Sequence, residues 1–220
     1  MRTIRITGKG NLKIHPDITR ITITLTGLYK DYTEALQRSS EDTEKLKDIV
    51  SVFGFERKDL KTVNFSVDTE YESYRENNEY KQRFAGYRYR HTMKIEFESD
   101  NDRLGKILYS LGNSALNPEF SISYTVKDQE AAKNSLLEKA VADANQKALV
   151  LTNAAGVSLK EIISVDYSRA ELNMEIRPMN RMMAFSKTTA DFDTEEKLSM
   201  DIEPDDISVS DTVTIVWEIV

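Results

Sequence analysis

The chain has 220 residues, of which 40% are apolar and 30% charged, with a formal net charge of −7 at pH 7. This composition is ordinary for a globular protein, and its acidity argues against general binding to nucleic acids or anionic membranes, which requires a basic surface. No apolar run is long enough to insert into and span a bilayer. With no cysteine, disulfides, a thiol nucleophile and thiolate metal sites are excluded.

Two strands open the chain, because apolar residues alternate with polar ones over about 2–8 and 18–28. The glycines of the intervening ITGKGNLKIHPD are not followed by a helix, which a phosphate-binding loop would need. We therefore expect an architectural bend between the strands, since glycine adopts backbone angles closed to other residues and a Pro-Asp pair sets the re-entry. The predicted turn residues here are Gly8, Gly10, Pro16 and Asp17.

A helix is predicted at about 31–53, followed by a long hairpin. The first arm of the hairpin places apolar residues on odd positions from 63 to 71, and the second does so from 87 to 97. The polar stretch RENNEYKQ forms the predicted tip, and Gly86 is assigned a structural turn role at the start of the second arm.

The second half of the chain alternates shorter elements. Alanines recur along one face of its long helix, which suits close packing on a sheet. The predicted elements are a short helix to about 111, a strand at 119–126, a helix at 128–155, a strand at 161–167, an irregular segment at about 169–203 and a C-terminal strand.

This order, ββαββαβαββ with hairpins as well as crossovers, predicts an α+β fold whose sheet is mixed or mostly antiparallel and is packed by about three helices. The length suits one domain covering residues 1–220. Two interlocked subdomains are the alternative: about 1–126 with the C-terminal strand, and about 127–205.

The segment EYKQRFAGYRYRH combines aromatic and basic residues, as nucleic-acid-binding surfaces do. Strand periodicity separates the two groups, because Tyr87 and Tyr89 share the core face while Arg88 and Arg90 point to the other. If the hairpin closes near residue 79, Glu70 lies opposite Arg88 and Asp68 lies opposite Arg90. We therefore expect a solvated charge ladder and no nucleic-acid partner.

No catalytic, cofactor or metal site is predicted. The two histidines, His15 and His91, lie in unrelated contexts, and His91 falls on the core face of its strand, which favours a structural role. The acidic run at 191–196 lacks the glycine that a calcium loop needs at its sixth position. No serine lies in a nucleophile elbow or beside a predicted histidine and carboxylate.

Methionines gather in the irregular segment, which holds five of the seven. Flexible thioethers suit adaptable contact surfaces, although the segment could equally fold back over a sheet face. A third interpretation is redox sensing, because thioethers can be oxidised to sulfoxides. The candidate oligomer contacts are Met174, Met179, Met182, Met183 and Phe185.

Taken together, the chain resembles the SIMPL domain family, a widespread bacterial group long catalogued as a domain of unknown function. The resemblance rests on ITGKG with its Pro-Asp pair, on GFERKDLKTVNFS, on Gly86-Tyr87 and on Leu104-Gly105. It extends to AVADANQKALVLTNAAGV and to IEPDDISVSDTVTIVWEI, where Pro-Asp-Asp replaces the usual Pro-Gly-Glu.

This resemblance implies an α+β fold, ring-like or channel-like homo-oligomers in some members, an association with oxidative-stress defence, and no established catalysis. We therefore expect a non-enzymatic, self-assembling protein with a protective or scaffolding role. The alternative is a small-ligand-binding protein or an enzyme with a pocket between helices and sheet, walled by Tyr87, Tyr89 or His91. Because the sequence begins without a secretory signal, we expect a cytoplasmic location, or the envelope if a leader was removed.

Overall fold

The computed structural model describes residues 2–167, 172–177 and 203–220, which form three helices and two sheets. The predicted α+β class with antiparallel pairing is confirmed, and the order of elements differs only by a short additional strand, β7 (Glu175–Ile176). Contacts divide the chain into two compact units. Unit 1 is Met1–Asp17, Tyr124–Ile176 and Pro204–Val220, and unit 2 is Ile18–Ser123 and Arg177–Glu203.

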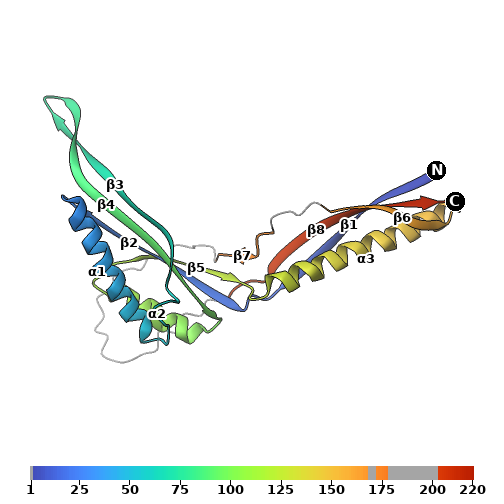
Figure 1. Cartoon of the computed structure of the whole chain (residues 1–220), viewed down its shortest axis with the longest axis horizontal. Helices are drawn as coiled ribbons and strands as arrows, with labels where there is room; N and C mark the ends of the chain where they lie inside the picture. Colours follow the sequence, from blue (N-terminus) through green and yellow to red (C-terminus); the bar gives the residue numbers. More distant parts are fainter. Residues whose placement is uncertain (1, 168–171, 178–202) are drawn as a thin grey trace. The chain divides into compact units, whose positions relative to one another are not determined.

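Unit 1 is a three-stranded sheet in the order β1-β8-β6 with one helix, α3, packed along it (Figure 1). Strands β1 (Arg2–Ile14) and β8 (Ile207–Ile219) pair along their whole length, and β6 (Leu159–Asp166) pairs with the other side of β8. Helix α3 (Gln129–Ala155) begins at the Asp128 cap and ends at Gly156, whose φ of +68° suits a glycine.

Gly8 and Gly10 lie inside β1, so the predicted bend at these glycines is wrong. A Cβ atom on Gly8 would lie 2.1 Å from the carbonyl oxygen of Ala140, and one on Gly10 would lie 2.1 Å from that of Leu136. The glycines therefore let the backbone of α3 approach β1 closely. Pro16 and Asp17 lie in the short irregular stretch between β1 and β2.

Unit 2 is built on strands β2 (Ile18–Tyr29), β3 (Lys61–Glu76) and β4 (Glu79–Glu98), in the sheet order β3-β4-β2-β5-β7. Strand β5 (Glu119–Thr125) starts in unit 2, and its last two residues, which pair with β7, belong to unit 1. Helices α1 (Tyr32–Ser51) and α2 (Asn101–Gly112) cover one face of the sheet. The buried core between the layers includes Ile21, Ile23, Leu46, Val50, Met93, Ile95, Leu104, Ile107 and Leu111.

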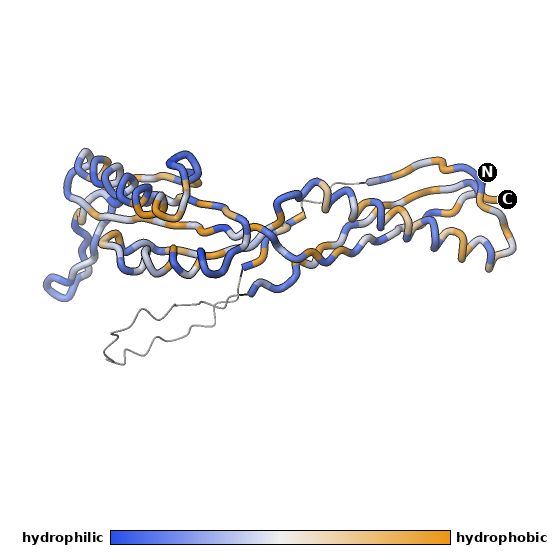
Figure 2. The backbone as a smooth tube through the Cα atoms, turned by 90° about the horizontal axis from the view of Figure 1, so that it is seen from below, coloured by the Kyte–Doolittle hydropathy of each residue, from blue (hydrophilic) through white to orange (hydrophobic). Residues whose placement is uncertain are grey.

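The β3–β4 hairpin closes at Asn77 and Asn78, whose φ angles of 52° and 68° are those of a two-residue turn. Figure 2 shows this tip as a hydrophilic loop. The register differs from the expected one, because Asp68, rather than Glu70, lies opposite Arg88.

Gly86 lies within β4 at a β-bulge rather than in a turn, which corrects its predicted role. Its φ is 151°, and a Cβ atom there would lie 2.3 Å from the carbonyl oxygen of Tyr29. The position therefore requires glycine on both conformational and steric grounds.

Met174 is only 3% exposed and packs in unit 1 against Val126, Leu136 and Ile207. It is a core residue of the chain and does not offer a contact surface, contrary to the sequence-based expectation. The other candidate contacts, Met179, Met182, Met183 and Phe185, lie outside the described residues.

Candidate functional site

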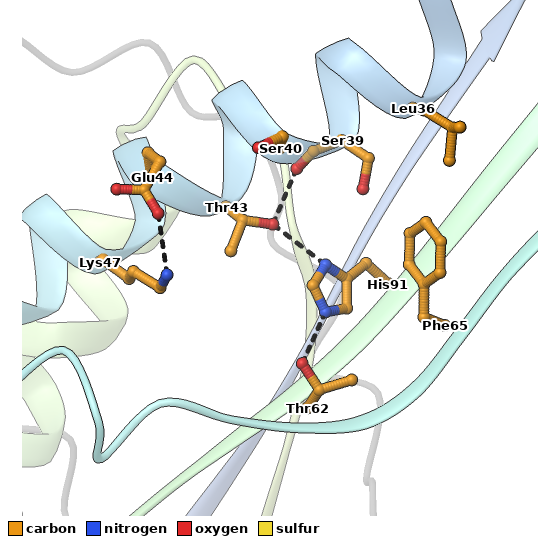
Figure 3. Close-up of a pocket in the computed structure, with 9 residues that line it drawn as sticks. All are labelled: Leu36, Ser39, Ser40, Thr43, Glu44, Lys47, Thr62, Phe65 and His91. Atoms are coloured by element: carbon orange, nitrogen blue, oxygen red, sulfur yellow. Dashed lines mark hydrogen bonds and ion pairs between the residues drawn. The ribbon is translucent and has the colours of Figure 1, made fainter. Parts of the chain in front are cut away.

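A pocket of about 370 Å³ lies in unit 2 between helix α1 and strands β3 and β4 (Figure 3). Its size falls within the range of small-molecule sites. The lining residues are Leu36, Ser39, Ser40, Thr43, Glu44, Lys47, Thr62, Phe65 and His91.

Helical and strand periodicity bring these side chains together. The α1 residues recur at intervals of three or four from Leu36 to Lys47, so they share one side of the helix. On the sheet, His91 of β4 lies directly opposite Phe65 of β3, and the two rings meet edge to face with centroids 5.1 Å apart. His91 points to the sheet face that the helices cover, which is why it reaches α1.

His91 is held by hydroxyl groups on both ring nitrogens, as Figure 3 shows. Thr43 donates its hydroxyl proton to the carbonyl oxygen of Ser39 at 2.7 Å. Its oxygen must therefore accept from Nδ1–H of His91, 3.0 Å away, which leaves Nε2 to accept from the hydroxyl of Thr62 at 2.9 Å. For a neutral imidazole, this pattern places the proton on Nδ1.

Burial lowers the pKa of His91, and the positive charge of Lys47 lowers it further. Both effects disfavour the imidazolium form. The partners on the two ring nitrogens are hydroxyl groups and not carboxylates, so they offer little to stabilise a proton gained during a reaction. The arrangement is suited to hydrogen bonding and poorly suited to general base catalysis.

The pocket carries an ion pair at one end, where Lys47 Nζ lies 2.8 Å from Glu44 Oε1. Glu44 also contacts Arg57, which in turn lies 3.2 Å from Asp48. With His91 neutral, these charges balance locally.

Of the three residues expected at a pocket wall, only His91 lines this pocket. Tyr89 is buried and donates its hydroxyl to Asp42 at 2.7 Å, and burial followed by this hydrogen bond raises its pKa. Tyr87 packs edge to face on Tyr32 and on Phe84.

The other sequence-based candidates do not assemble into a site. His15 lies in unit 1, exposed, with Nδ1 3.6 Å from Asp206. Among the residues that the structure describes, no group of three or more His, Asp or Glu side chains could hold a metal ion. The acidic run at 191–196 falls outside them.

The hairpin arginines are paired with acids, as the charge-ladder interpretation predicts, but not by the expected register. Arg88 binds Glu70 through two hydrogen bonds, one of them 2.6 Å long from Nη2, although Glu70 lies diagonal to it. This contact lowers the pKa of Glu70 and raises that of Arg88. Arg90 lies 3.6 Å from Glu119 of β5 instead of pairing with Asp68.

Sequence reasoning did not assign Thr43, Thr62 or Lys47 to a site. Thr62 falls in the stretch GFERKDLKTVNFS, which indicated only the family resemblance, and Thr43 and Lys47 belong to no motif. The available signal was a row of polar residues on one side of α1, which recur at helical spacing from Ser39 to Lys47. Combined with a histidine on the core face of a neighbouring strand, that row indicates a polar pocket between helix and sheet.

The fold is that of an α+β protein of two units, and unit 2 carries a pocket lined in part by His91. The chain belongs to the SIMPL family, described as a protein of unknown function (DUF541), which matches residues 4–217. No helix in the described part of the chain is long and apolar enough to cross a membrane.

Two kinds of relative support this assignment. The chain is 26% identical over 175 residues to the 26 kDa periplasmic immunogenic protein of Brucella melitensis, covering 79% of this chain and 70% of the relative. It is 23% identical over 210 residues to the uncharacterized protein YggE of Escherichia coli, covering 90% and 82% respectively. Among solved structures, CutA from Synechococcus elongatus PCC7942 matches 58% of this chain and 95% of its own, with 15% identity and a TM-score of 0.20.

The expectation of a cytoplasmic location is contradicted by these comparisons, because the Brucella relative is named a periplasmic protein. That expectation rested on the composition of the first residues of the sequence, which does not decide the location of the protein.

Proposed function

We propose that this chain is a non-enzymatic protein of the bacterial cell envelope that assembles with copies of itself and serves a protective or scaffolding role under stress. The envelope location is supported by the name of the Brucella relative. Self-assembly is supported by one observation above all, the exposed apolar edge strand of unit 1.

Strand β6 is an edge of its sheet, and every residue from Lys160 to Asp166 is exposed. Three of them are large and apolar: Ile162, Ile163 and Val165 are 51%, 43% and 55% exposed. An exposed edge strand presents unpaired backbone N–H and C=O groups, and here they lie beside exposed apolar side chains. Both features promote pairing with a strand of another chain. A second copy is the simplest partner because it carries the same surface at the same concentration.

The opposite edge, β1, is partly closed by the chain itself. Asp143 of α3 accepts a hydrogen bond from the backbone N–H of Lys9 at 2.7 Å, and Lys147 Nζ lies 3.5 Å from the carbonyl oxygen of Thr7. Side chains that occupy edge groups in this way discourage strand addition. The contrast favours β6 as the assembling edge.

Multi-angle light scattering of the purified protein across a range of concentrations tests the proposal. We expect an assembly larger than a monomer, which Ile163→Lys together with Val165→Lys weakens by placing charge on the edge. Ser210→Lys together with Thr212→Lys is the matched control, because both residues are exposed on the central strand β8 and the pair adds the same charge away from an edge. A monomer at every concentration, or equal masses for both variants, would refute it.

The methionine-rich segment remains part of the proposal as a second contact. Replacing Met179, Met182 and Met183 with serine should lower the assembled mass if they contribute, and peroxide treatment followed by mass spectrometry would show whether these thioethers oxidise first. An unchanged mass would leave assembly to β6 alone, and uniform oxidation of all seven methionines would argue against a stress-sensing role for them.

A further inference from the structure

The His91 pocket has two chemically different ends, and Figure 3 shows them on either side of the imidazole. Glu44 and Lys47 form the charged end, and Leu36 and Phe65 form the apolar end. Leu36 and Phe65 remain 37% and 43% exposed, so their apolar surface is available to a ligand.

The charged end presents the Glu44 carboxylate and the Lys47 ammonium side by side, 2.8 Å apart, and the second cation at Glu44, Arg57, is balanced by Asp48. This arrangement complements a molecule that carries both an ammonium and a carboxylate, since each charge of the ligand finds an opposite partner. A ligand with a net charge gains one attraction and suffers one repulsion, because the local charges balance. The charged end therefore favours a zwitterion.

The distance between the ends sets the size of the ligand. The helical rise places the Cα atoms of Lys47 and Leu36, one from each end, about 16 Å apart. Side chains on a helix lean toward its N-terminus, which brings the Lys47 ammonium nearer to His91. The effect of Lys47 on the pKa of His91 agrees with this proximity. A ligand whose charged groups bind the Glu44–Lys47 ion pair must therefore carry a ring large enough to contact Phe65.

The middle of the pocket offers hydrogen-bonding groups. Ser39 lines the pocket, and the residue as a whole is 3% exposed. A hydroxyl group in a pocket wall can both donate a hydrogen bond to a ligand and accept one from it. Thr62, whose proton is given to His91, keeps a lone pair that can accept a further hydrogen bond.

From these features we propose that the pocket binds a free α-amino acid with an aromatic side chain, its carboxylate on Lys47, its ammonium on Glu44 and its ring against Phe65 and Leu36. The ring would add an edge-to-face contact to the one that His91 already makes with Phe65. This inference goes beyond the proposed assembly and rests on unit 2, whereas the assembling edge lies in unit 1.

Isothermal titration calorimetry at pH 7.5 with L-tryptophan as the probe tests the proposal on the full chain. We expect saturable binding with a Kd of about 1 mM or tighter. Indole-3-propionate, which lacks the ammonium, and tryptamine, which lacks the carboxylate, should each bind about tenfold more weakly. These analogues test the charge requirement without altering the protein.

Variants test where the ligand binds. Lys47→Met and Phe65→Ala should each weaken tryptophan binding by about tenfold, while Val63→Ala, on the same strand but outside the pocket lining, should leave it unchanged. The proposal is overturned by the absence of saturable binding, by indole-3-propionate binding as tightly as tryptophan, or by full affinity in Lys47→Met. Should Phe65→Ala fail to fold, the analogue series and Lys47→Met decide the question.

Discussion

At the scale of single residues, the contact between Gly8 and α3 depends on a missing Cβ atom. In Gly8→Ala the new methyl carbon would meet the backbone of Ala140 at 2.1 Å and that of Ala144 at 2.5 Å. Backbone cannot rotate away as a side chain can, so the helix must shift from β1. We expect Gly8→Ala to lower the free energy of unfolding by about 2–3 kcal/mol, the upper range for overpacking.

Urea denaturation measures this loss, and Gly112→Ala serves as its control. A Cβ atom on Gly112 would meet no atom within 4 Å, and the residue lies at the end of α2. Alanine favours helix over glycine, so the control should be neutral or stabilising by about 0.5 kcal/mol. Equal effects of the two substitutions would contradict a close helix–strand contact at Gly8.

His91 gives a second residue-scale prediction, which concerns pH. Burial and Lys47 lower its pKa in the folded chain, so between the folded and unfolded pKa values the unfolded chain binds more protons. Stability should therefore fall as the pH drops below about 6.5, the unperturbed value for histidine. The lowered pKa values of Glu70 and Asp143 act below the usual carboxylate range, in a separate window.

His91→Asn removes this titration. Its free energy of unfolding, measured by urea denaturation from pH 7.5 to pH 5.5, should be lower than that of the unmodified chain at the top of the range, because the bonds to Thr43 and Thr62 are lost. It should also decline less with falling pH. A parallel decline in both proteins would assign the pH dependence to other groups.

At the scale of elements, the β3–β4 hairpin shows where sequence patterns lose precision. Alternation of apolar residues predicted both arms and the core face of β4, on which Tyr89, Met93 and Ile95 are buried. The register was missed by two residues, because it depends on the turn at Asn77 and Asn78 and on bulges near Thr62 and Glu70. Asparagine tolerates positive φ at little cost, but neighbouring polar residues offered equally acceptable turns.

This turn carries the element-scale prediction. Asn78 has a φ of 68°, which costs other non-glycine residues about 1 kcal/mol. Asn78→Gly should therefore preserve the hairpin, whereas Asn78→Val should loosen it. Hydrogen exchange of the amides of Arg75 to Lys81 reads the difference: we expect faster exchange only in the valine variant, and similar rates in both would argue against this turn.

At the scale of the whole molecule, the division into units follows packing that no local pattern reveals. The subdomain boundaries expected near residue 126 assigned α3 to a separate half from β1. In the structure α3 packs on β1 and β8, the two ends of the sequence, because glycines in β1 and alanines in α3 fit together. Each partner was visible in the sequence, but their pairing across more than a hundred residues was not.

From the same division we expect that the larger segment of unit 2, Ile18–Ser123, folds by itself. Every member of the large core cluster falls within this stretch, from Ile21 to the partly buried Ile122. The residues of unit 1 that flank this stretch also lie close together, because the backbone N–H of Asp17 donates to the carbonyl oxygen of Thr125 at 3.2 Å. A stretch with its own core and neighbouring ends has the properties of an inserted domain.

We therefore expect the fragment 18–123 to unfold cooperatively in urea, with an m value of about 1–2 kcal/mol/M, typical of a small domain. The fragment 18–98 is its control: it lacks α2, which supplies Leu104, Ile107, Leu108 and Leu111 to the core. Without those side chains the apolar face of β2 and β4 is left partly uncovered, and unfolding should be broad and non-cooperative. A cooperative transition in 18–98, or none in 18–123, would show that the core of unit 2 does not determine its folding.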